Sequence, residues 1–253
     1  MKISVLGAGC IGGSIALKLK EKHHVTAFDR DEETMKALEE NGIETVSKES
    51  DLYDTDLLVL ALPMSVEERF LKETDFSGKI LDVASVKTSF MEIARERGLN
   101  FTGGHPMAGN ERKGKSGWDR EMFDGKIFFL CSLDGKEDGM IENIVKDLGA
   151  RPLWIDYRIH DEIVAAVSHV QYLISLSARY VGKPFEGYAG PGYMSNTRLS
   201  KQNMEMALDM IRYNKENILK YLENARNFLN VLYHLIERED FENLKKAIRE
   251  VIS

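Results

Sequence analysis

The stretch KISVLGAGCIGGSIALKLK, residues 2–20, decides the fold because it joins a short apolar strand to a helical pattern through spaced glycines. Lys2–Leu6 has the apolar, β-branched character of a buried strand, and Gly12–Glu21 repeats its apolar residues at helical spacing. Between the two lies a G-x-G-x-x-G pattern formed by Gly7, Gly9 and Gly12. A strand, this loop and a helix in that order are the context of a dinucleotide-binding turn.

Each glycine of this loop has a separate predicted task. Gly7 permits the tight turn, Gly9 lets the backbone approach a pyrophosphate, and Gly12 lets helix and strand pack closely. The helix start offers unpaired N–H groups to phosphates, so Ile11 is included in the candidate cofactor site. The alternative is a sharp turn whose glycines serve packing only. A second strand at Val25–Asp29 ends in an acid at the distance expected for ribose hydroxyls, which favours the dinucleotide site.

The acid also bears on which dinucleotide binds. Asp29 favours NAD, because a carboxylate repels a ribose 2′-phosphate. Arg30 follows immediately and can serve such a phosphate, so NADP stays open. The turn after the next apolar strand, Asp56–Leu62, adds Ala61 and Pro63 to the candidate cofactor site.

Outward from the loop, short β-rich runs alternate with amphipathic helices. Strands are predicted at 2–6, 25–29, 56–62, 79–82, 100–102 and 126–131, and helices at 12–21, 32–41, 66–72, 88–97 and 136–148. This alternation predicts an α/β Rossmann domain, doubly wound around a mostly parallel sheet, over residues 1–155. From Asp161 onward the pattern is helical throughout, which predicts a helical substrate-binding and dimerisation domain over residues 156–253.

Composition excludes several classes of function. The 253 residues carry a net charge of −7, which argues against nucleic-acid and anionic-membrane binding. The most apolar segment, LLVLALPM at 57–64, is too short to span a membrane and reads as a buried strand. Two cysteines cannot form a disulfide framework, and no His, Asp and Glu arrangement matches a metal site. We expect a cytoplasmic protein without a metal.

The candidates for chemistry follow predicted strands, because ligands of open α/β sheets bind beyond the carboxyl ends of the strands. His105 is the best acid–base candidate, in a predicted rigid loop after two glycines; a solvent-exposed loop histidine is the alternative. Ser85 can hydrogen-bond a substrate hydroxyl or cap a helix beginning near Val86. Helix capping explains the pair His160 and Asp161. His169, within an apolar helix, is predicted to be a hydrogen-bonded core residue.

Several motifs together resemble the prephenate/arogenate dehydrogenase family: GAGCIGGS at 7–14, DVASVK at 82–87, GGHPMAGNE at 103–111, HDEIVAAVSH at 160–169, TRLSKQN at 197–203 and NKENI at 214–218. The resemblance covers nearly the whole chain in order. GGHPMAG after DVASVK is more specific than the glycine loop and carries the most weight.

The resemblance implies an oxidative decarboxylation, in which hydride leaves C4 of a cyclohexadienyl ring for NAD(P)⁺ and CO₂ leaves C1. It makes His105 the acceptor or base for the C4 hydroxyl and Ser85 a second partner of that group. It makes Arg198 the residue that binds a substrate carboxylate, which a planar guanidinium does in bidentate fashion. His169 resembles a family histidine near the substrate, which weakens the core interpretation.

Two departures from the family concern the presumed pocket. Tyr172 stands where many relatives have a second histidine, and Gln202 and Asn203 stand where an acid and proline are common. The chain ends soon after its last helices, so we expect the single-function form without a mutase or ACT domain, and any tyrosine feedback would act at the active site.

Arogenate dehydrogenase is the main alternative within the enzyme class. A 3-hydroxy acid or imine reductase shares a similar domain plan, but the HPMAG loop after the last parallel strands argues against it. A non-catalytic NAD-sensing module is a different class, and His105, Ser85 and Arg198 together disfavour it. We expect a homodimer formed through the C-terminal helices.

Overall fold

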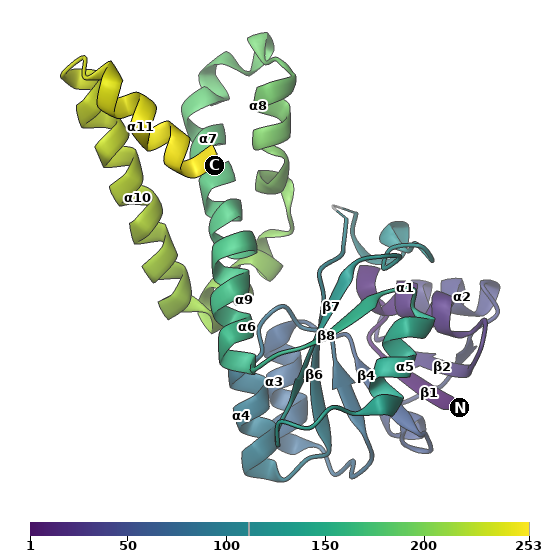
Figure 1. The fold of residues 1–253 in the computed structure, drawn as a ribbon. Helices are drawn as coiled ribbons and strands as arrows, with labels where there is room; N and C mark the ends of the chain where they lie inside the picture. Colours follow the sequence, from purple (N-terminus) through teal and green to yellow (C-terminus); the bar gives the residue numbers. More distant parts are fainter. Residues whose placement is uncertain (111, 253) are drawn as a thin grey trace.

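The computed structural model describes residues 1–110 and 112–252, and it has two parts (Figure 1). An eight-stranded sheet with helices on both faces forms the first part, and helices alone form the second. The predicted fold class is therefore confirmed.

The sheet has the strand order β3-β2-β1-β4-β5-β6-β7-β8. Every neighbouring pair is parallel except β6 and β7, which run antiparallel. The strands are β1 Lys2–Leu6, β2 His24–Phe28, β3 Glu44–Thr45, β4 Leu57–Leu60, β5 Ile80–Asp82, β6 Phe101–Pro106, β7 Ile127–Ser132 and β8 Arg151–Trp154.

Both faces of the sheet are covered, and the central strand β4 shows why its sequence is apolar throughout. Leu57 and Val59 face one core with helices α1 Cys10–Leu19, α2 Glu32–Glu40 and α5 Gly139–Asp147. Leu58 and Leu60 face the other core, with helices α3 Met64–Glu73 and α4 Thr88–Arg97. Alternate side chains of a strand point to opposite faces, so a strand covered on both sides needs apolar residues at every position.

The helical part begins with a long rod. Helix α6 Tyr157–Val164, a π-helical turn Ala165–His169 and helix α7 Val170–Gly182 follow one another without a break. The remaining elements are the 3-10 helix Lys183–Tyr188, α8 Pro191–Asn196, the 3-10 helix Arg198–Lys201, α9 Met204–Tyr213, α10 Lys215–Glu237 and α11 Phe241–Ile252.

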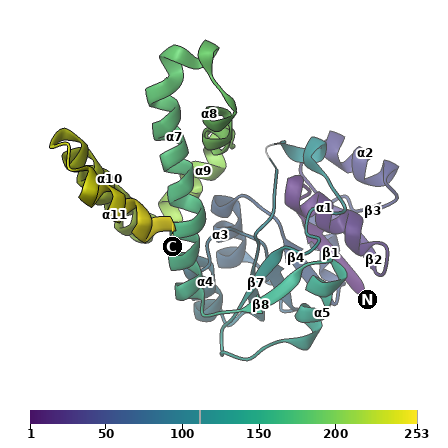
Figure 2. The ribbon, with the colours of Figure 1, turned by 45° about the horizontal axis from the view of Figure 1, so that its top comes forward.

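Helices α10 and α11 pack side by side and stand away from the sheet (Figure 2). They leave many large apolar side chains exposed: Leu219, Phe228, Leu229, Val231, Tyr233, Ile236, Phe241, Ile248, Val251 and Ile252. No helix among the described residues is long and apolar enough to cross a membrane.

One predicted boundary was wrong in a way that matters for the site. The strand expected to stop at Thr102 continues to Pro106, so His105 lies in β6 and pairs with Phe129 instead of occupying a loop. The helix predicted at 88–97 is confirmed as α4 Thr88–Arg97, with Lys87 at its cap position, so no helix begins near Val86 as the capping alternative for Ser85 requires. The short strands β3 and β8 were missed, because β3 has two residues and β8 contains Pro152 on a partly exposed edge.

Candidate functional site

The glycine loop between β1 and α1 has the shape predicted for it. Gly7 has φ of 90°, and a Cβ there would lie 2.5 Å from the carbonyl oxygen of Ala61. A Cβ at Gly12 would overlap the carbonyl oxygen of Gly7. At Gly9, by contrast, a Cβ would meet nothing within 4 Å. Two glycines are therefore needed for the packing of the loop, and Gly9 faces open space at the start of α1, where a phosphate group fits.

The acid predicted after the second strand lies beside this loop. Asp29 follows β2, and its Oδ2 accepts a hydrogen bond from the N–H of Ala8 at 2.7 Å. Its Oδ1 accepts from the N–H of Asp31 at 3.0 Å. Each carboxylate oxygen keeps a further lone pair for a ribose hydroxyl. Arg30 is exposed in the turn before α2.

The turn after β4 supplies the floor of the loop. Ala61 lies under Gly7, and Pro63 is the cap residue of α3. The glycines, Asp29 and this turn meet at the carboxyl edge of adjacent parallel strands, so the structure places the candidate cofactor residues in one region.

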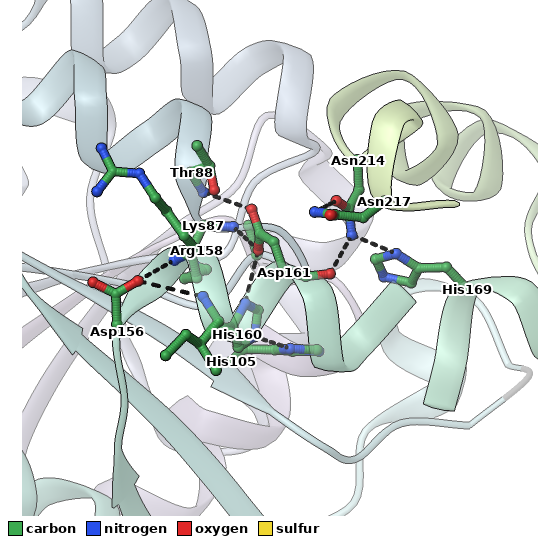
Figure 3. Close-up of polar contacts among 12 residues, drawn as sticks. Lys87, Thr88, His105, Asp156, Arg158, His160, Asp161, His169, Asn214 and Asn217 are labelled. Carbon is green, nitrogen blue, oxygen red and sulfur yellow. Dashed lines mark hydrogen bonds and ion pairs between the residues drawn. The ribbon is translucent and has the colours of Figure 1, made fainter. Parts of the chain in front are cut away.

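A chain of three side chains extends from His105 (Figure 3). Nδ1 of His105 lies 2.9 Å from Nε2 of His160, and Nδ1 of His160 lies 2.8 Å from Oδ1 of Asp161. His105 comes from β6 of the sheet, whereas the other two residues come from α6 of the helical part. All three are buried. The chain therefore crosses from one part of the molecule to the other.

The far end of the chain is fixed by a helix terminus. Asp161 accepts hydrogen bonds from the backbone N–H groups of Lys87 and Thr88, each at 2.8 Å, at the start of α4. The expectation that His160 and Asp161 cap their own helix was wrong, because Asp156 caps α6 and Asp161 caps α4. The capping alternative for Ser85 fails for the same reason. Ser85 instead lies partly buried in the turn between β5 and α4.

The pKa values along this hydrogen-bonded chain indicate which atoms carry its protons. Burial raises the pKa of Asp161, but its hydrogen bonds with His160 and Thr88 outweigh burial and hold the pKa below the ordinary value. The ionised carboxylate then accepts from Nδ1–H of His160, whose Nε2 in turn accepts from Nδ1–H of His105. This assignment leaves Nε2 of His105 with a free lone pair.

Both imidazoles are held neutral. Burial lowers the pKa of His105 well below the ordinary histidine value, and His160, Lys87 and His169 lower it further. Burial also lowers the pKa of His160, although the hydrogen bond to Asp161 acts in the opposite direction. A neutral histidine with a fixed tautomer is a proton acceptor at a defined position.

A buried ion pair supports the strand that carries His105. The Lys87 ammonium group pairs with Asp82 and also donates to the carbonyl oxygen of Gly104 at 2.7 Å. Asp82 Oδ1 accepts from the N–H of Gly104 at 2.7 Å. A Cβ at Gly104 would lie 2.5 Å from the backbone oxygen of Asp82, so the glycines before His105 permit a close approach of two strands.

A third ionisable group adjoins this pair. Glu67 of α3 is fully buried, and neither carboxylate oxygen has a hydrogen-bond donor among the described residues. Burial, followed by the charge of Asp82, raises the pKa of Glu67 well above the ordinary value.

His169 closes the π-helical turn and is 1% exposed. Its Nδ1 accepts from the side-chain amide of Asn214 at 3.1 Å, and the same amide donates to the backbone oxygen of Asp161 at 2.8 Å. Its Nε2 is buried without a partner among the described residues. Burial lowers the pKa of His169 to about 4. Nδ1 is therefore hydrogen-bonded within the core, as predicted for a core histidine, whereas Nε2 is available to a ligand.

Arg198 opens a short 3-10 helix that packs against α7. The side chain is exposed and makes contacts of its own. Glu111, the last residue of the GGHPMAGNE motif, lies outside the described residues. Within the described chain, no three His, Cys, Asp or Glu side chains are placed to hold a metal ion.

Comparison with known proteins identifies this arrangement. The family model for the prephenate dehydrogenase nucleotide-binding domain matches residues 15–153, and the model for the prephenate dehydrogenase dimerization domain matches residues 157–250. The chain belongs to the prephenate dehydrogenase family.

Individual members of the family are distant in sequence and close in structure. Prephenate dehydrogenase of Lactococcus lactis is 26% identical over 98% of this chain and 75% of its own length. The crystal structure of A. aeolicus prephenate dehydrogenase with hydroxyphenyl propionate and NAD⁺ has a TM-score of 0.90 at 25% identity, covering 99% of this chain and 96% of that one. Synechocystis arogenate dehydrogenase has a TM-score of 0.79 at 26% identity, covering 99% and 97%.

Sequence reasoning missed the residues that surround His105. The sequence predicts a local cap at His160 and Asp161, and it assigns no individual role to Lys87, Asp82 or Asn214. An available signal was the adjacency of a histidine and an acid at the start of a helix that follows the sheet domain. The partners of that pair lie more than 50 residues away, so spacing alone could not reveal them.

Proposed function

We propose that this chain catalyses the NAD-dependent oxidative decarboxylation of prephenate to 4-hydroxyphenylpyruvate, with release of CO₂. Family membership supports the reaction class. The observation that carries the proposal is the hydrogen-bonded chain from Asp161 through His160 to His105, which leaves one ring nitrogen of His105 as a fixed acceptor. That acceptor lies in the strand next to β5, at the edge where the glycine loop opens.

His105 holds the proton of the reaction. Nε2 accepts the proton of the C4 hydroxyl while the C4 hydrogen leaves with its electron pair, and the C1 carboxylate leaves as CO₂. The ring becomes aromatic, and the proton returns from His105 to the phenolic oxygen, so atoms and charge balance without a net proton. Bound NAD⁺ supplies the nicotinamide carbon that takes the hydride. The ionised Asp161 stabilises the imidazolium through His160.

Other residues have proposed tasks in binding. Ser85 hydrogen-bonds the C4 hydroxyl, and His169 offers its Nε2, which has no partner among the described residues, to the substrate. Arg198 binds a substrate carboxylate, because a guanidinium suits a carboxylate in bidentate fashion. Gly7, Gly9, Ile11 and Gly12 bind the pyrophosphate, Asp29 the ribose hydroxyls, and Ala61 and Pro63 line the cofactor site, with Arg30 beside it.

Two further proposals concern the assembly and the location of the protein. We propose a homodimer formed through the C-terminal helices, because α10 and α11 expose a large set of apolar side chains and the matching family model is a dimerization domain. A cytoplasmic location suits a chain that uses free NAD. We also propose that the division near residues 155–156 separates the cofactor-binding domain from the substrate-binding and dimerisation domain.

Arogenate is the second candidate substrate, since the Synechocystis enzyme of similar fold is an arogenate dehydrogenase. The test mixes the protein with NAD⁺ or NADP⁺ and with prephenate or arogenate, and follows the absorbance of the reduced nicotinamide. We expect the fastest reduction with prephenate and NAD⁺. Faster reduction with arogenate would make arogenate the substrate in place of prephenate. No reduction with any of the four pairs would refute the enzymatic proposal in favour of a non-catalytic NAD-binding module.

A further inference from the structure

One tryptophan side chain, from a segment more than 100 residues away in the sequence, holds the backbone of the glycine loop. After β6 the chain passes over the start of α1 before it returns as β7, and we call residues 112–126 of this connection the strap. Nε1–H of Trp118 in the strap donates to the carbonyl oxygens of both Ala8 and Gly9, each at 3.0 Å.

Further contacts fasten the strap to the same turn. The backbone N–H of Asp119 donates to the buried hydroxyl of Ser14 at 2.9 Å. The thiol of Cys10 donates to the carbonyl oxygen of Gly117 at 3.3 Å. The fourth glycine of the sequence GAGCIGG also has a task here, because a Cβ at Gly13 would overlap the indole ring of Trp118.

The geometry of the peptide bond says what the indole does to the loop. In a trans peptide unit, the carbonyl oxygen and the N–H of the following residue point in opposite directions. When Trp118 holds the carbonyl oxygen of Ala8, it turns the N–H of Gly9 to the opposite side. The carbonyl oxygen of Gly9 also accepts the helical hydrogen bond from the N–H of Gly13 at 3.0 Å, and the indole holds it in the same direction, so the N–H of Cys10 points the same way as that of Gly9. Two successive N–H groups are thereby directed together, as an anion-binding backbone requires.

We propose that Trp118 is a positioning residue for the cofactor, which orients the N–H groups of Gly9 and Cys10 toward the pyrophosphate of the dinucleotide. The inference deepens the proposed function, since it rests on a dinucleotide at the glycine loop. It also gives the strap a role, because the segment that leaves the strand of His105 is the one that sets the shape of the cofactor loop.

The first test removes the indole N–H and keeps an aromatic ring. Trp118→Phe is expected to raise the dissociation constant of NAD⁺ about tenfold, measured by calorimetry without substrate, because one shared hydrogen bond no longer orients the loop. The KM for prephenate at saturating NAD⁺ stays within about twofold of the parent value. Trp118→His, which keeps a ring N–H, is expected to recover part of the affinity.

The matched control is Trp154→Phe, the same change at the other of the two tryptophans. Trp154 lies in β8 at the far edge of the sheet, so its replacement leaves NAD⁺ affinity unchanged. Equal NAD⁺ affinity in Trp118→Phe and the parent would overturn the positioning role and leave the proposed reaction intact. A parent protein that binds no NAD⁺ would overturn both.

A second measurement needs no change at Trp118. In Trp154→Phe, Trp118 is the sole tryptophan, so its emission reports on the glycine loop. We expect saturating NAD⁺ to change the intensity or wavelength of that emission, because the pyrophosphate binds the other side of the same two peptide units. Unchanged emission, with binding established by calorimetry, would contradict the proposal even if Trp118→Phe does not fold.

Discussion

The two sides of the site are built from different parts of the chain. The cofactor side is mostly backbone, where closely packed glycines bring N–H groups to the start of α1. The substrate side consists of buried ionisable side chains, joined by hydrogen bonds from α4 through α6 to β6. A site made of backbone is disturbed by a substitution that adds an atom, whereas a hydrogen-bonded chain of side chains is broken by a substitution that removes one of those side chains.

This difference predicts different responses to mutation, pH and substrate. Changes on the cofactor side alter the affinity for NAD⁺ and leave the proton transfer intact. Changes on the substrate side alter turnover and acid stability and leave the dinucleotide affinity intact. Each experiment below separates the two sides or shows that they are not separate.

The largest expected effect is on turnover in His105→Asn. The variant loses the lone pair that accepts the hydroxyl proton, so kcat falls by about 10²–10⁴-fold, the usual contribution of a general base. NAD⁺ affinity, measured by calorimetry, stays at the parent value. The control is His24→Asn, which changes an exposed histidine of β2. Near-normal turnover would remove His105 from its role, and weakened NAD⁺ binding would show that the two sides are coupled.

We expect the free energy of unfolding to fall at acidic pH because buried histidines take up protons more readily in the unfolded chain. The pKa of His169 is about 4 in the folded chain, against an ordinary value of 6.5. Above pH 6.5 both states are neutral there. As pH falls from 6.5 toward 4, His169 takes up a proton in the unfolded chain but stays neutral in the folded chain. The free energy of unfolding therefore falls by up to about 3 kcal/mol.

Denaturant titrations at pH 7, 6, 5 and 4 measure this loss. We expect His169→Gln to lose less stability over the window than the parent does, because glutamine does not titrate. The same pH dependence in both proteins would mean that other groups, such as His105 and His160, account for all of the acid sensitivity. NAD⁺ affinity measured well above this window should be unaffected by the substitution.

On the cofactor side, the sharpest variant adds one methyl group at Gly9. A Cβ there meets nothing within 4 Å, and φ is −62°, so Gly9→Ala should fold with an unchanged melting temperature. The methyl occupies the space through which a pyrophosphate approaches, so the NAD⁺ dissociation constant rises about tenfold or more. The control is Gly139→Ala, another glycine with open space around it, at the start of α5. Unaltered affinity in Gly9→Ala would place the phosphates elsewhere.

A change within the helical part tests whether it supplies substrate affinity. Arg198→Ala should raise the KM for prephenate about tenfold with a smaller effect on kcat, because a charged hydrogen bond to a carboxylate is lost. Arg151→Ala, an exposed arginine on the edge strand β8, is the control. An unchanged KM would exclude Arg198 as the carboxylate anchor.

The same difference in construction explains what the sequence could reveal. The glycine loop and Asp29 were predictable because their spacing along the chain is local: the glycines lie in one short turn, and Asp29 follows 21 residues after Ala8, whose N–H it accepts. The sheet was predictable because strands covered on both faces are apolar at every position, as β4 is. His105 was found by its residue type and its place near a strand end.

The partners of His105 could not be found in this way. His160 and Asp161 look like a local cap until α6 is packed against the start of α4, and only tertiary structure provides that contact. Trp118 lies 109 residues from Gly9, and no sequence period links the two. The end of β6 was misjudged because Gly103 and Gly104 suggest a turn, whereas here they serve the close approach of Lys87 and Asp82.

The smallest expected effect concerns Asp29, where side chain and backbone meet on the cofactor side. Its Oδ2 accepts from the N–H of Ala8, so the carboxylate orders the loop in addition to its proposed contact with the ribose. Asp29→Ser should weaken NAD⁺ by a few-fold and shift the NAD⁺/NADP⁺ preference toward NADP⁺, because the charge that repels a 2′-phosphate is gone and Arg30 is adjacent. Asp29→Asn separates the two tasks, since its amide oxygen can still accept from Ala8 without the negative charge. If serine and asparagine shift the preference equally, charge at the ribose decides it. If only serine weakens NAD⁺, the main task of Asp29 is to hold the backbone, as Trp118 is proposed to do from the other side.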